Sequence, residues 1–411
     1  MKKTIKLAVV AALALGTTSA FATNGSALIG AGAKSRGMGG TGIGVSHGAE
    51  SALSNPALIT SIDKDHEISF GGTFFMPDVS ANMGAGYSSS AADLSVIPEV
   101  SIAGKITDNF YMGVGMWGTA GMGVDYRDET GYTSNMNMVT NLQLMQFGVD
   151  FAYKVSGFSV AITPVLQYGA LDINYNPGSG EVGEGISQDL AFGYNLGIAY
   201  EISNFTLGAV YKSQIDMDYS GQLSSATQPF VDMGIFPGAM SDSLSTPAEL
   251  GFGVSYQSGA HTVAADYKMI QWSDADGYKS FNWDDQDVIA LGYEYNANVW
   301  ALRLGYNYAS NPISDAGAMT LAQGGNNVAM YSGNAMNTFN LLGFPAIVES
   351  HYTIGGSYLI SETVSMDLAY VYAPETTLSL ATMPDMQNGR DMSTTVKHSQ
   401  SSLSFQLNYA F

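Results

Sequence analysis

The chain has 411 residues and a formal net charge of −21 at pH 7, and it contains no cysteine. Acidity of this size disfavours nucleic acid as a partner, and the missing cysteines exclude disulfide and thiol chemistry. Only 12% of the residues are charged, while 48 glycines, 24 tyrosines and 18 phenylalanines are present, which favours one large barrel over two or three soluble domains.

The first 22 residues have the composition of a secretory signal peptide. Three lysines among the first six residues precede an apolar run over residues 7–15 and the small-x-small sequence Ala20-Phe21-Ala22. We therefore expect a signal peptide over residues 1–22 and a mature chain that begins at Thr23. No later segment approaches the roughly 20 apolar residues that a membrane-spanning helix requires, so the exported chain is not expected to be a helical membrane protein.

Residues 23–65 are dense in glycine and contain Gly37-Met38-Gly39-Gly40-Thr41-Gly42, which matches the G-x-G-x-x-G fingerprint of dinucleotide sites. That fingerprint requires a strand before it and a helix after it. No strand-like run precedes these glycines, and Asn55-Pro56 would interrupt the helix. Matches to a nucleophile elbow at residues 44–48 and to a phosphate loop at Lys34-Ser35 also lack their required setting. We expect no cofactor here, and instead a compact segment whose bare backbone packs closely.

From residue 66 onward, apolar residues recur at every second position in segments of about ten residues. In the last segment Leu403, Phe405 and Leu407 alternate with Ser404 and Gln406, so one face suits lipid and the other suits a wet lumen. Fourteen such segments are predicted, at 67–77, 97–106, 110–118, 139–155, 158–174, 189–202, 204–220, 246–257, 260–273, 286–296, 298–309, 349–360, 362–374 and 400–411.

The connections between these segments alternate between tight turns and long polar loops. The long loops are predicted at 78–96, 119–138, 175–188, 221–245, 274–285, 310–348 and 375–399. Long loops on one side and an even strand count are typical of outer-membrane barrels, whereas a soluble β-sandwich would not sort its loops in this way. The predicted fold class is therefore all-β, a 14-stranded antiparallel transmembrane β-barrel over residues 66–411. Its bore would pass solute freely unless filled, so residues 23–65 are predicted to form a plug in the lumen.

Two of the long loops are more apolar than exposed loops should be. They cover residues 229–237 and 339–348, and apolar patches of this kind either bind something or pack on each other as a lid. The candidate ligand contacts are Phe230, Met233, Ile235, Phe236, Leu341, Leu342 and Phe344.

Glycines gather at the end of the third predicted strand, where Gly118, Gly121 and Gly123 would permit a bend or simply begin an ordinary loop. By the alternation of the strands, the cations Lys212, Lys268 and Arg303 point into the lumen, where they could bind a carboxylate. Acidic side chains also point inward, so charge ladders across the lumen are the alternative; these acids are Asp150, Asp216, Asp266, Glu294 and Asp367.

No metal site is expected, because the five histidines are scattered without metal-ligand spacing. An outer-membrane barrel enzyme would need a serine and a histidine brought together at the rim or on the lipid face, which spacing cannot show. A water-filled diffusion porin is opposed by the plug-like segment at residues 23–65. Transport of a ligand is therefore favoured over catalysis.

Several stretches resemble the FadL family of outer-membrane transporters for long-chain fatty acids and other hydrophobic compounds. The runs Asn24-Gly25, residues 30–40 and Ser54-Asn55-Pro56-Ala57-Leu58 are similar to the N-terminal hatch of that family, and Asn408-Tyr409-Ala410-Phe411 is similar to its C-terminus. The hatch motif residues carried over are Gly37, Met38, Gly39, Gly40, Asn55, Pro56 and Ala57.

The resemblance implies passive uptake of long-chain fatty acids or other hydrophobic compounds, with capture by extracellular loops, a pocket in the lumen and sideways exit at an inward kink in the third strand. Movement of the hatch would couple to this transfer. The implied partners are a hydrophobic ligand, outer-membrane lipid and, through Phe411, the barrel-assembly machinery. The loop at 175–188 is shorter than in fatty-acid members, and the inward acids leave open a neutral ligand such as an aromatic hydrocarbon.

Overall fold

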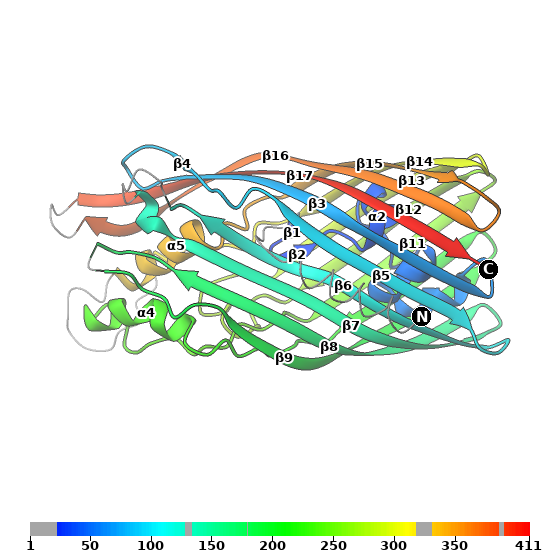
Figure 1. Ribbon diagram of the computed structural model, residues 1–411, viewed down its shortest axis with the longest axis horizontal. Coiled ribbons are helices and arrows are strands. Elements are labelled where there is room, and N and C mark those ends of the chain that lie inside the picture. The colour runs from blue at the N-terminus through cyan, green and yellow to red at the C-terminus, as the bar shows by residue number, and fades with distance from the viewer. Residues whose placement is uncertain (1–22, 128–133, 179, 318–330, 386–389) are drawn as a thin grey trace, which may run out of the picture.

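The computed structural model describes residues 23–127, 134–178, 180–317, 331–385 and 390–411. The predicted signal peptide at residues 1–22 lies outside this part of the chain. Residues 66–410 form a closed ring of fourteen antiparallel strands, because β17 pairs with β3 as well as with β16 (Figure 1). The prediction of a 14-stranded antiparallel barrel is confirmed.

The barrel strands follow one another around the ring in chain order. They are β3 (His66–Asn82), β5 (Ser95–Lys105), β6 (Phe110–Asp125), β7 (Val139–Val155), β8 (Phe158–Asn174), β9 (Ser187–Ile202), β10 (Phe205–Lys212), β11 (Glu249–Ser258), β12 (His261–Ile270), β13 (Gln286–Asn296), β14 (Trp300–Ala309), β15 (Ser350–Leu359), β16 (Val364–Asp385) and β17 (Arg390–Ala410). The short strand β4 (Ser88–Ser89) pairs with the end of β3.

Alternating burial along the strands gives the barrel an apolar outer face. In β9, Tyr194, Leu196, Ile198 and Tyr200 are exposed, whereas Asn195 and Ala199 between them are buried. The same pattern continues around the ring as a band of exposed leucine, isoleucine, phenylalanine and tyrosine, the outer surface that lipid favours. No helix within the described residues has the length and apolar character needed to cross a membrane.

Several strands begin or end in different places from those predicted. Strand β6 continues to Asp125 because it stays paired with β7, and β10 ends at Lys212, after which only isolated bridges such as Ile215–Thr246 continue the ladder. The loop predicted at 375–399 is wrong over most of its length, because β16 and β17 extend into it as a long hairpin. Leu378 and Leu380 on one face of this hairpin pack against the apolar cluster beneath it, which explains the extension.

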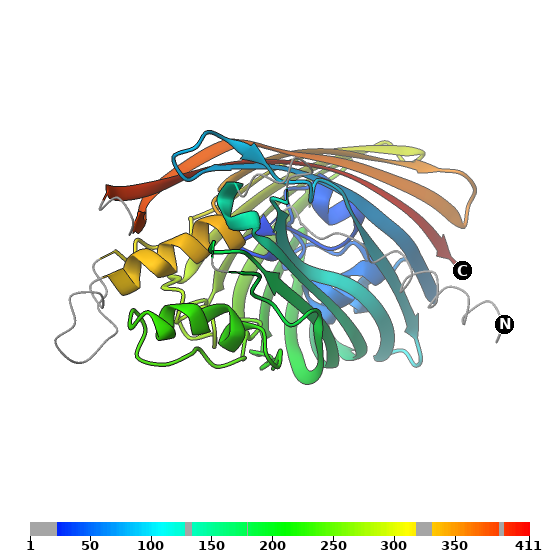
Figure 2. The ribbon, with the colours of Figure 1, turned by 60° about the vertical axis from the view of Figure 1, so that its left-hand side comes forward.

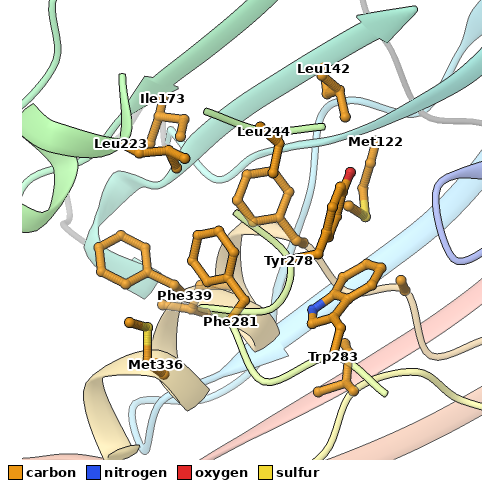
Figure 3. Packing of buried hydrophobic residues seen from close by; sticks show 14 of the residues in the cluster. Met122, Leu142, Ile173, Leu223, Leu244, Tyr278, Phe281, Trp283, Met336 and Phe339 are labelled. Atoms are coloured by element: carbon orange, nitrogen blue, oxygen red, sulfur yellow. The ribbon is translucent and has the colours of Figure 1, made fainter. Parts of the chain in front are cut away.

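The long connections gather at the end of the barrel opposite the C-terminus (Figure 2). They contain the 3-10 helix η3 (Ser134–Asn137), α4 (Leu223–Asp232) and α5 (Ser332–Gly343). Buried side chains from these helices and from the ends of the strands form one apolar cluster (Figure 3). This cluster closes that end of the barrel around residues such as Leu223, Tyr278 and Phe339.

Residues 23–65, hereafter the N-terminal segment, lie within the ring of strands (Figures 1 and 2). The segment contains β1 (Thr23–Asn24), β2 (Ala27–Leu28), α2 (Gly32–Gly37), η1 (Gly48–Glu50), α3 (Ser51–Ser54) and η2 (Pro56–Ser61). Its glycines permit close approach to the wall: Gly39 has a φ of +70°, and a Cβ there would lie 2.7 Å from the Leu291 carbonyl oxygen and from the Tyr306 backbone. Larger residues would not fit at this position.

Candidate functional site

A hollow of the lumen lies between the N-terminal segment and the wall formed by β6, β7 and β10–β12. Its empty volume, including space that is open to solvent, is about 1010 Å³. Much of its lining is apolar, and includes Leu28, Ile29, Leu53, Leu142, Leu144 and Ile270. A long apolar molecule would therefore be sheltered from water along most of its length. We call this space the cavity.

Charged side chains are concentrated on one wall of the cavity. Lys212, Glu249 and Lys268 come from the three neighbouring strands β10, β11 and β12, and all three line the cavity. Lys212 Nζ lies 3.2 Å from Glu249 Oε1, whereas no carboxylate in the described part of the chain forms an ion pair with Lys268. Gly251 lies opposite Lys268 in the ladder and leaves room for its stem. The wall thus offers two cations against one carboxylate.

The third candidate cation, Arg303, does not line the cavity. Its Nε lies 2.6 Å from Glu294 Oε2, and its Nη1 lies 3.5 Å from Asp367 Oδ1 and donates to Ser357 Oγ at 2.6 Å. Arg303 therefore belongs to a charge ladder along the wall, which was the alternative explanation for the lumen cations. A buried ladder of this kind satisfies its own charges and leaves little for a ligand.

Several inward acids hold the N-terminal segment in place. Asp266 Oδ2 accepts hydrogen bonds from the Gly42 and Ile43 N–H groups, at 2.7 and 2.8 Å, and Asp367 lies 4.0 Å from Lys34. Asp150 instead accepts from Thr163 on the neighbouring strand. The predicted inward acid Asp216 lies beyond the end of β10 and is exposed.

The predicted motif Asn55-Pro56-Ala57 forms a tight junction. Asn55 Oδ1 accepts from the Ala57 N–H at 3.1 Å, while Nδ2 donates to the carbonyls of Ile43 and Ile198 at 2.8 and 3.0 Å. Pro56 begins η2, where its missing N–H costs nothing. The motif therefore joins two parts of the N-terminal segment to the wall at β9.

Burial changes the protonation of two side chains in the N-terminal segment. Burial lowers the pKa of His47 to about 3, although the ring is hydrogen-bonded to the Thr41 carbonyl at 2.7 Å. Burial raises the pKa of Glu50 well above its ordinary value; Lys34 opposes this increase, and Asp367 and Glu99 add to it. His47 is therefore neutral at pH 7 in the folded protein, and burial favours the protonated form of Glu50.

Strand β6 leaves its neighbour β5 at a bulge between Gly118 and Ala120. Pairing of β5 with β6 runs from Lys105–Tyr111 to Glu99–Trp117 and stops there. Beyond the bulge, β6 instead pairs with β2 of the N-terminal segment through Ala27 and Ala120. We call the boundary between β5 and β6 the seam, and its end at Glu99–Trp117 the open end.

The predicted glycines occupy different places relative to this bulge. Gly118 lies at the bulge itself, whereas Gly121 and Gly123 follow it within β6 and pair with β7. Thr119 and Ala120, at the bulge, line the cavity. The open end of the seam therefore borders the space in which a ligand would sit, while the role of these glycines in a lateral gate stays a prediction.

The two apolar loops pack on each other. The rings of Phe230 and Phe339 lie 5.3 Å apart, and the ring of Phe344 lies 5.6 Å from that of Phe281 in the connection after β12. Six of the seven candidate ligand contacts are buried in the apolar cluster, and Met233 is 46% exposed. None of the seven lines the cavity. The geometry is that of a lid, and direct contact of these residues with ligand stays a prediction.

Three cavity residues were missed by sequence reasoning. Glu249 begins β11 opposite Lys212, so pairing of the two predicted strands would have revealed it. Trp272 and Tyr278 come from the connection after β12, and their rings pack with centroids 4.6 Å apart on the wall of the cavity. Nothing in the local sequence indicates that this connection folds back into the lumen.

Comparison with known proteins identifies relatives of similar length. Among curated proteins, the chain is 22% identical over 404 residues to outer membrane protein P1 of Haemophilus influenzae, covering 81% of this chain and 83% of that protein. A crystal structure of a Pseudomonas aeruginosa FadL homologue is 16% identical with a TM-score of 0.71, covering 94% of this chain and 100% of the other. The P. putida toluene transporter TodX is 18% identical with a TM-score of 0.66, covering 93% and 99%.

The family comparison covers most of the chain. Residues 8–322 match the family described as outer membrane protein transport protein (OMPP1/FadL/TodX). The relatives named above are outer-membrane proteins and transporters, not enzymes. The chain therefore belongs to the OMPP1/FadL/TodX family of outer-membrane transport proteins, and it is a β-barrel of the bacterial outer membrane with the fold of a transporter for hydrophobic compounds.

Proposed function

We propose that the protein carries hydrophobic molecules with an anionic head group, long-chain fatty acids in particular, passively across the outer membrane. The observation that carries this proposal is Lys268, a buried cation that lines an otherwise largely apolar cavity and has no ion-pair partner among the described residues. A buried charge without a partner is costly, and a ligand carboxylate would remove that cost. Lys212 beside it adds a second positive charge, partly balanced by Glu249.

The apolar part of the cavity suits the rest of such a ligand. Each methylene buried there contributes about 0.8 kcal/mol, so a long alkyl chain would be retained even by a modest groove. The lid formed by the two apolar loops lies at the end of the barrel through which a ligand would enter from outside. In this proposal the lid loops capture the ligand and pass it to the cavity.

Exit from the cavity is proposed to be sideways, at the open end of the seam. Thr119 and Ala120 belong to both the bulge and the cavity lining, so a ligand that moves past them reaches the open end of the seam. Ala27 of β2, which pairs with Ala120, would have to move aside. The outer face on either side of the seam is apolar, as at Ile102 and Val114. The ligand would therefore enter lipid directly, and the N-terminal segment acts as a hatch that closes the lumen.

Uptake of aromatic hydrocarbons is the second candidate function. Trp272 and Tyr278 on the cavity wall offer aromatic surface to a flat ligand, and the similar structures include toluene transporters of P. putida and Ralstonia pickettii. A neutral hydrocarbon would not use Lys268. The two candidates therefore differ in their dependence on this one side chain.

Equilibrium binding of tritiated oleate and of toluene to the purified protein and to Lys268→Met separates them. Loss of a charge-assisted contact of about 1.5–3 kcal/mol predicts oleate binding weaker by about ten- to a hundredfold, with toluene binding unchanged. Lys397→Met is the matched control, because Lys397 pairs with Glu375 on the protruding hairpin, 3.3 Å away and outside the cavity. Unchanged oleate binding in Lys268→Met, or saturable binding of toluene alone, would overturn the fatty-acid proposal.

A further inference from the structure

One buried ion pair joins the N-terminal segment to the open end of the seam. Arg36 on α2 is 0% exposed, and its Nη2 lies 2.6 Å from Glu99 Oε1 on β5. The other oxygen of Glu99 accepts from the Gly32 N–H, at the start of α2, at 2.8 Å. A single carboxylate of the wall therefore holds both ends of α2, in a buried site where charge-assisted hydrogen bonds are strong.

Glu99 occupies a special place on the wall. Pairing of β5 with β6 covers residues 99–105, so Glu99, opposite Trp117, is the residue at the open end of the seam. The residue before it is Pro98, which has no N–H to continue the ladder. Trp117 in turn donates from Nε1 to Ser101 Oγ on β5 at 2.8 Å. Displacement of α2 therefore pulls on the residue at which the seam stops being hydrogen-bonded.

A second carboxylate, that of Glu50, lines the same small cavity as that of Glu99. Glu50 is 4% exposed, and neither of its carboxylate oxygens has a hydrogen-bond partner among the described residues. Glu50, Glu99 and Gly32 line one small cavity next to Trp117, and a Cβ on Gly32 would collide with the Glu50 carboxylate. The two carboxylates thus flank the start of α2.

Arg36 has unused donors for this second partner. Its Nε and Nη1 are buried without hydrogen-bond partners in the described structure. A shift of α2 that carries Arg36 from Glu99 to Glu50 would form a new buried pair, so the arginine would not be left alone in either position. Such an exchange is a two-state element of the kind that conformational coupling requires. The remaining charges around α2 are Lys34, Glu67, Arg303 and Asp367.

We infer that Arg36 and Glu99 form a latch that holds α2 against the open end of the seam, and that ligand leaves through the seam when Arg36 exchanges Glu99 for Glu50. This inference rests on the proposed function for its ligand and its exit route. Arg36, Glu50 and Glu99 are positioning residues in this mechanism. They set how often the seam opens, and they do not line the larger cavity in which the ligand is held.

The test compares Glu99→Gln and Glu50→Gln in the full-length protein, because the two substitutions should act in opposite directions. Glu99→Gln weakens the closed latch, so release of bound tritiated oleate into phospholipid vesicles should accelerate about tenfold. Glu50→Gln removes the second partner, so release should slow by a similar factor. Equilibrium binding of oleate should stay within about threefold of wild type in both variants, since the cavity contacts are unchanged. Release of oleate decides between the two roles, because Glu50→Gln is also expected to stabilise the folded protein at pH 7.5 and a structural role alone predicts no slower release.

A control variant and a double variant show whether faster release comes from the latch or from a general loosening of the protein. Glu294→Gln removes an ion pair of the same 2.6 Å length from β13 and β14, while Arg303 keeps Asp367, so release should match wild type. Arg36→Gln/Glu99→Gln removes both buried charges together and should also release ligand quickly if Glu99→Gln folds poorly.

Amide hydrogen exchange provides the readout that needs no ligand. Residues 30–40 and 115–121 should exchange about tenfold faster in Glu99→Gln and more slowly in Glu50→Gln, which tests the latch even if oleate does not bind. If wild type does not bind oleate but the exchange rates change as described, oleate is not the ligand and the latch is still supported. Exchange and release that shift in the same direction in both variants, or not at all, would overturn the latch.

Discussion

Acidification should loosen the N-terminal segment through His47. This ring is buried and neutral in the folded protein, with a pKa of about 3 against an ordinary value of 6.5. Unfolding exposes the ring, and between these two values the unfolded form binds a proton that the folded form does not. The contribution of His47 is therefore fully present above pH 6.5 and is lost as the pH falls toward 3.

The size of this effect follows from the same two pKa values. The difference between the two pKa values corresponds to about 5 kcal/mol of unfolding free energy, of which about 2 kcal/mol is lost at pH 5. The variant His47→Gln removes the titration while its amide can still donate to the Thr41 carbonyl, which the ring contacts at 2.7 Å. Urea unfolding in detergent at pH 7.5 and pH 5 measures the free energy of unfolding of each protein.

The informative quantity is the difference between the two proteins at the two pH values, because the other titrating groups then cancel. Wild type should lose about 2 kcal/mol more than His47→Gln between pH 7.5 and pH 5. An equal pH dependence in both proteins would refute the reasoning, since it would mean that the ring is accessible to protons in the folded state.

Three further changes have expected outcomes. Gly39→Ala should displace the N-terminal segment and lower the free energy of unfolding by more than about 2 kcal/mol, because the new Cβ would lie 2.7 Å from backbone atoms of the wall. Trypsin should then cleave after Lys34 and Arg36. The control Gly84→Ala should stay resistant to trypsin, because Gly84 has a φ of +102° but lies in open space. Glu50→Gln should raise the melting temperature at pH 7.5 but not at pH 4. Because the pKa of Glu50 is raised in the folded protein, Glu50 makes the protein lose stability as the pH rises above the ordinary pKa of a glutamate, and glutamine does not. An equal rise in melting temperature at both pH values would contradict this. Phe339→Ala should lower the free energy of unfolding by about 3–5 kcal/mol, because Phe339 packs in the apolar cluster of the lid. The same change should speed the entry of oleate in stopped-flow fluorescence. An unchanged entry rate would show that the lid does not limit access.

The sequence predicted the barrel well because each strand records its two environments in alternate residues. Lipid on one side and lumen on the other impose the same period on Leu403 and Phe405 as on Leu196 and Ile198, and the structure confirms both sets as exposed. Strand ends were less predictable because pairing, not composition, decides them. β6 continues past Gly118 because it stays paired with β7, while β2 replaces β5 on its other side.

The candidate site was only partly predictable for a related reason. Parity placed Lys212, Lys268 and Arg303 in the lumen, but partners along the wall decide which cation remains for a ligand, and that requires the register of neighbouring strands. Arg303 is paired with Glu294 and Asp367, whereas Lys268 forms no ion pair with any residue that the structure describes. Contacts between distant segments, such as that of Arg36 with Glu99 or of Trp272 with the cavity, leave no local pattern in the sequence.

A reversible disulfide across the seam tests the central claim, that ligand leaves the cavity sideways between β5 and β6. A Cβ on Gly118 would lie 3.8 Å from the Cβ of Ile97, which is the usual spacing in a disulfide, and the chain has no other cysteine. The measurement is transfer of tritiated oleate from the variant Ile97→Cys/Gly118→Cys to acceptor vesicles, oxidised and then reduced. Lateral exit predicts that the oxidised protein binds oleate but does not release it, and that reduction restores release. Equal transfer in the oxidised and reduced forms would contradict the account, because ligand would then leave by a route that does not need the seam.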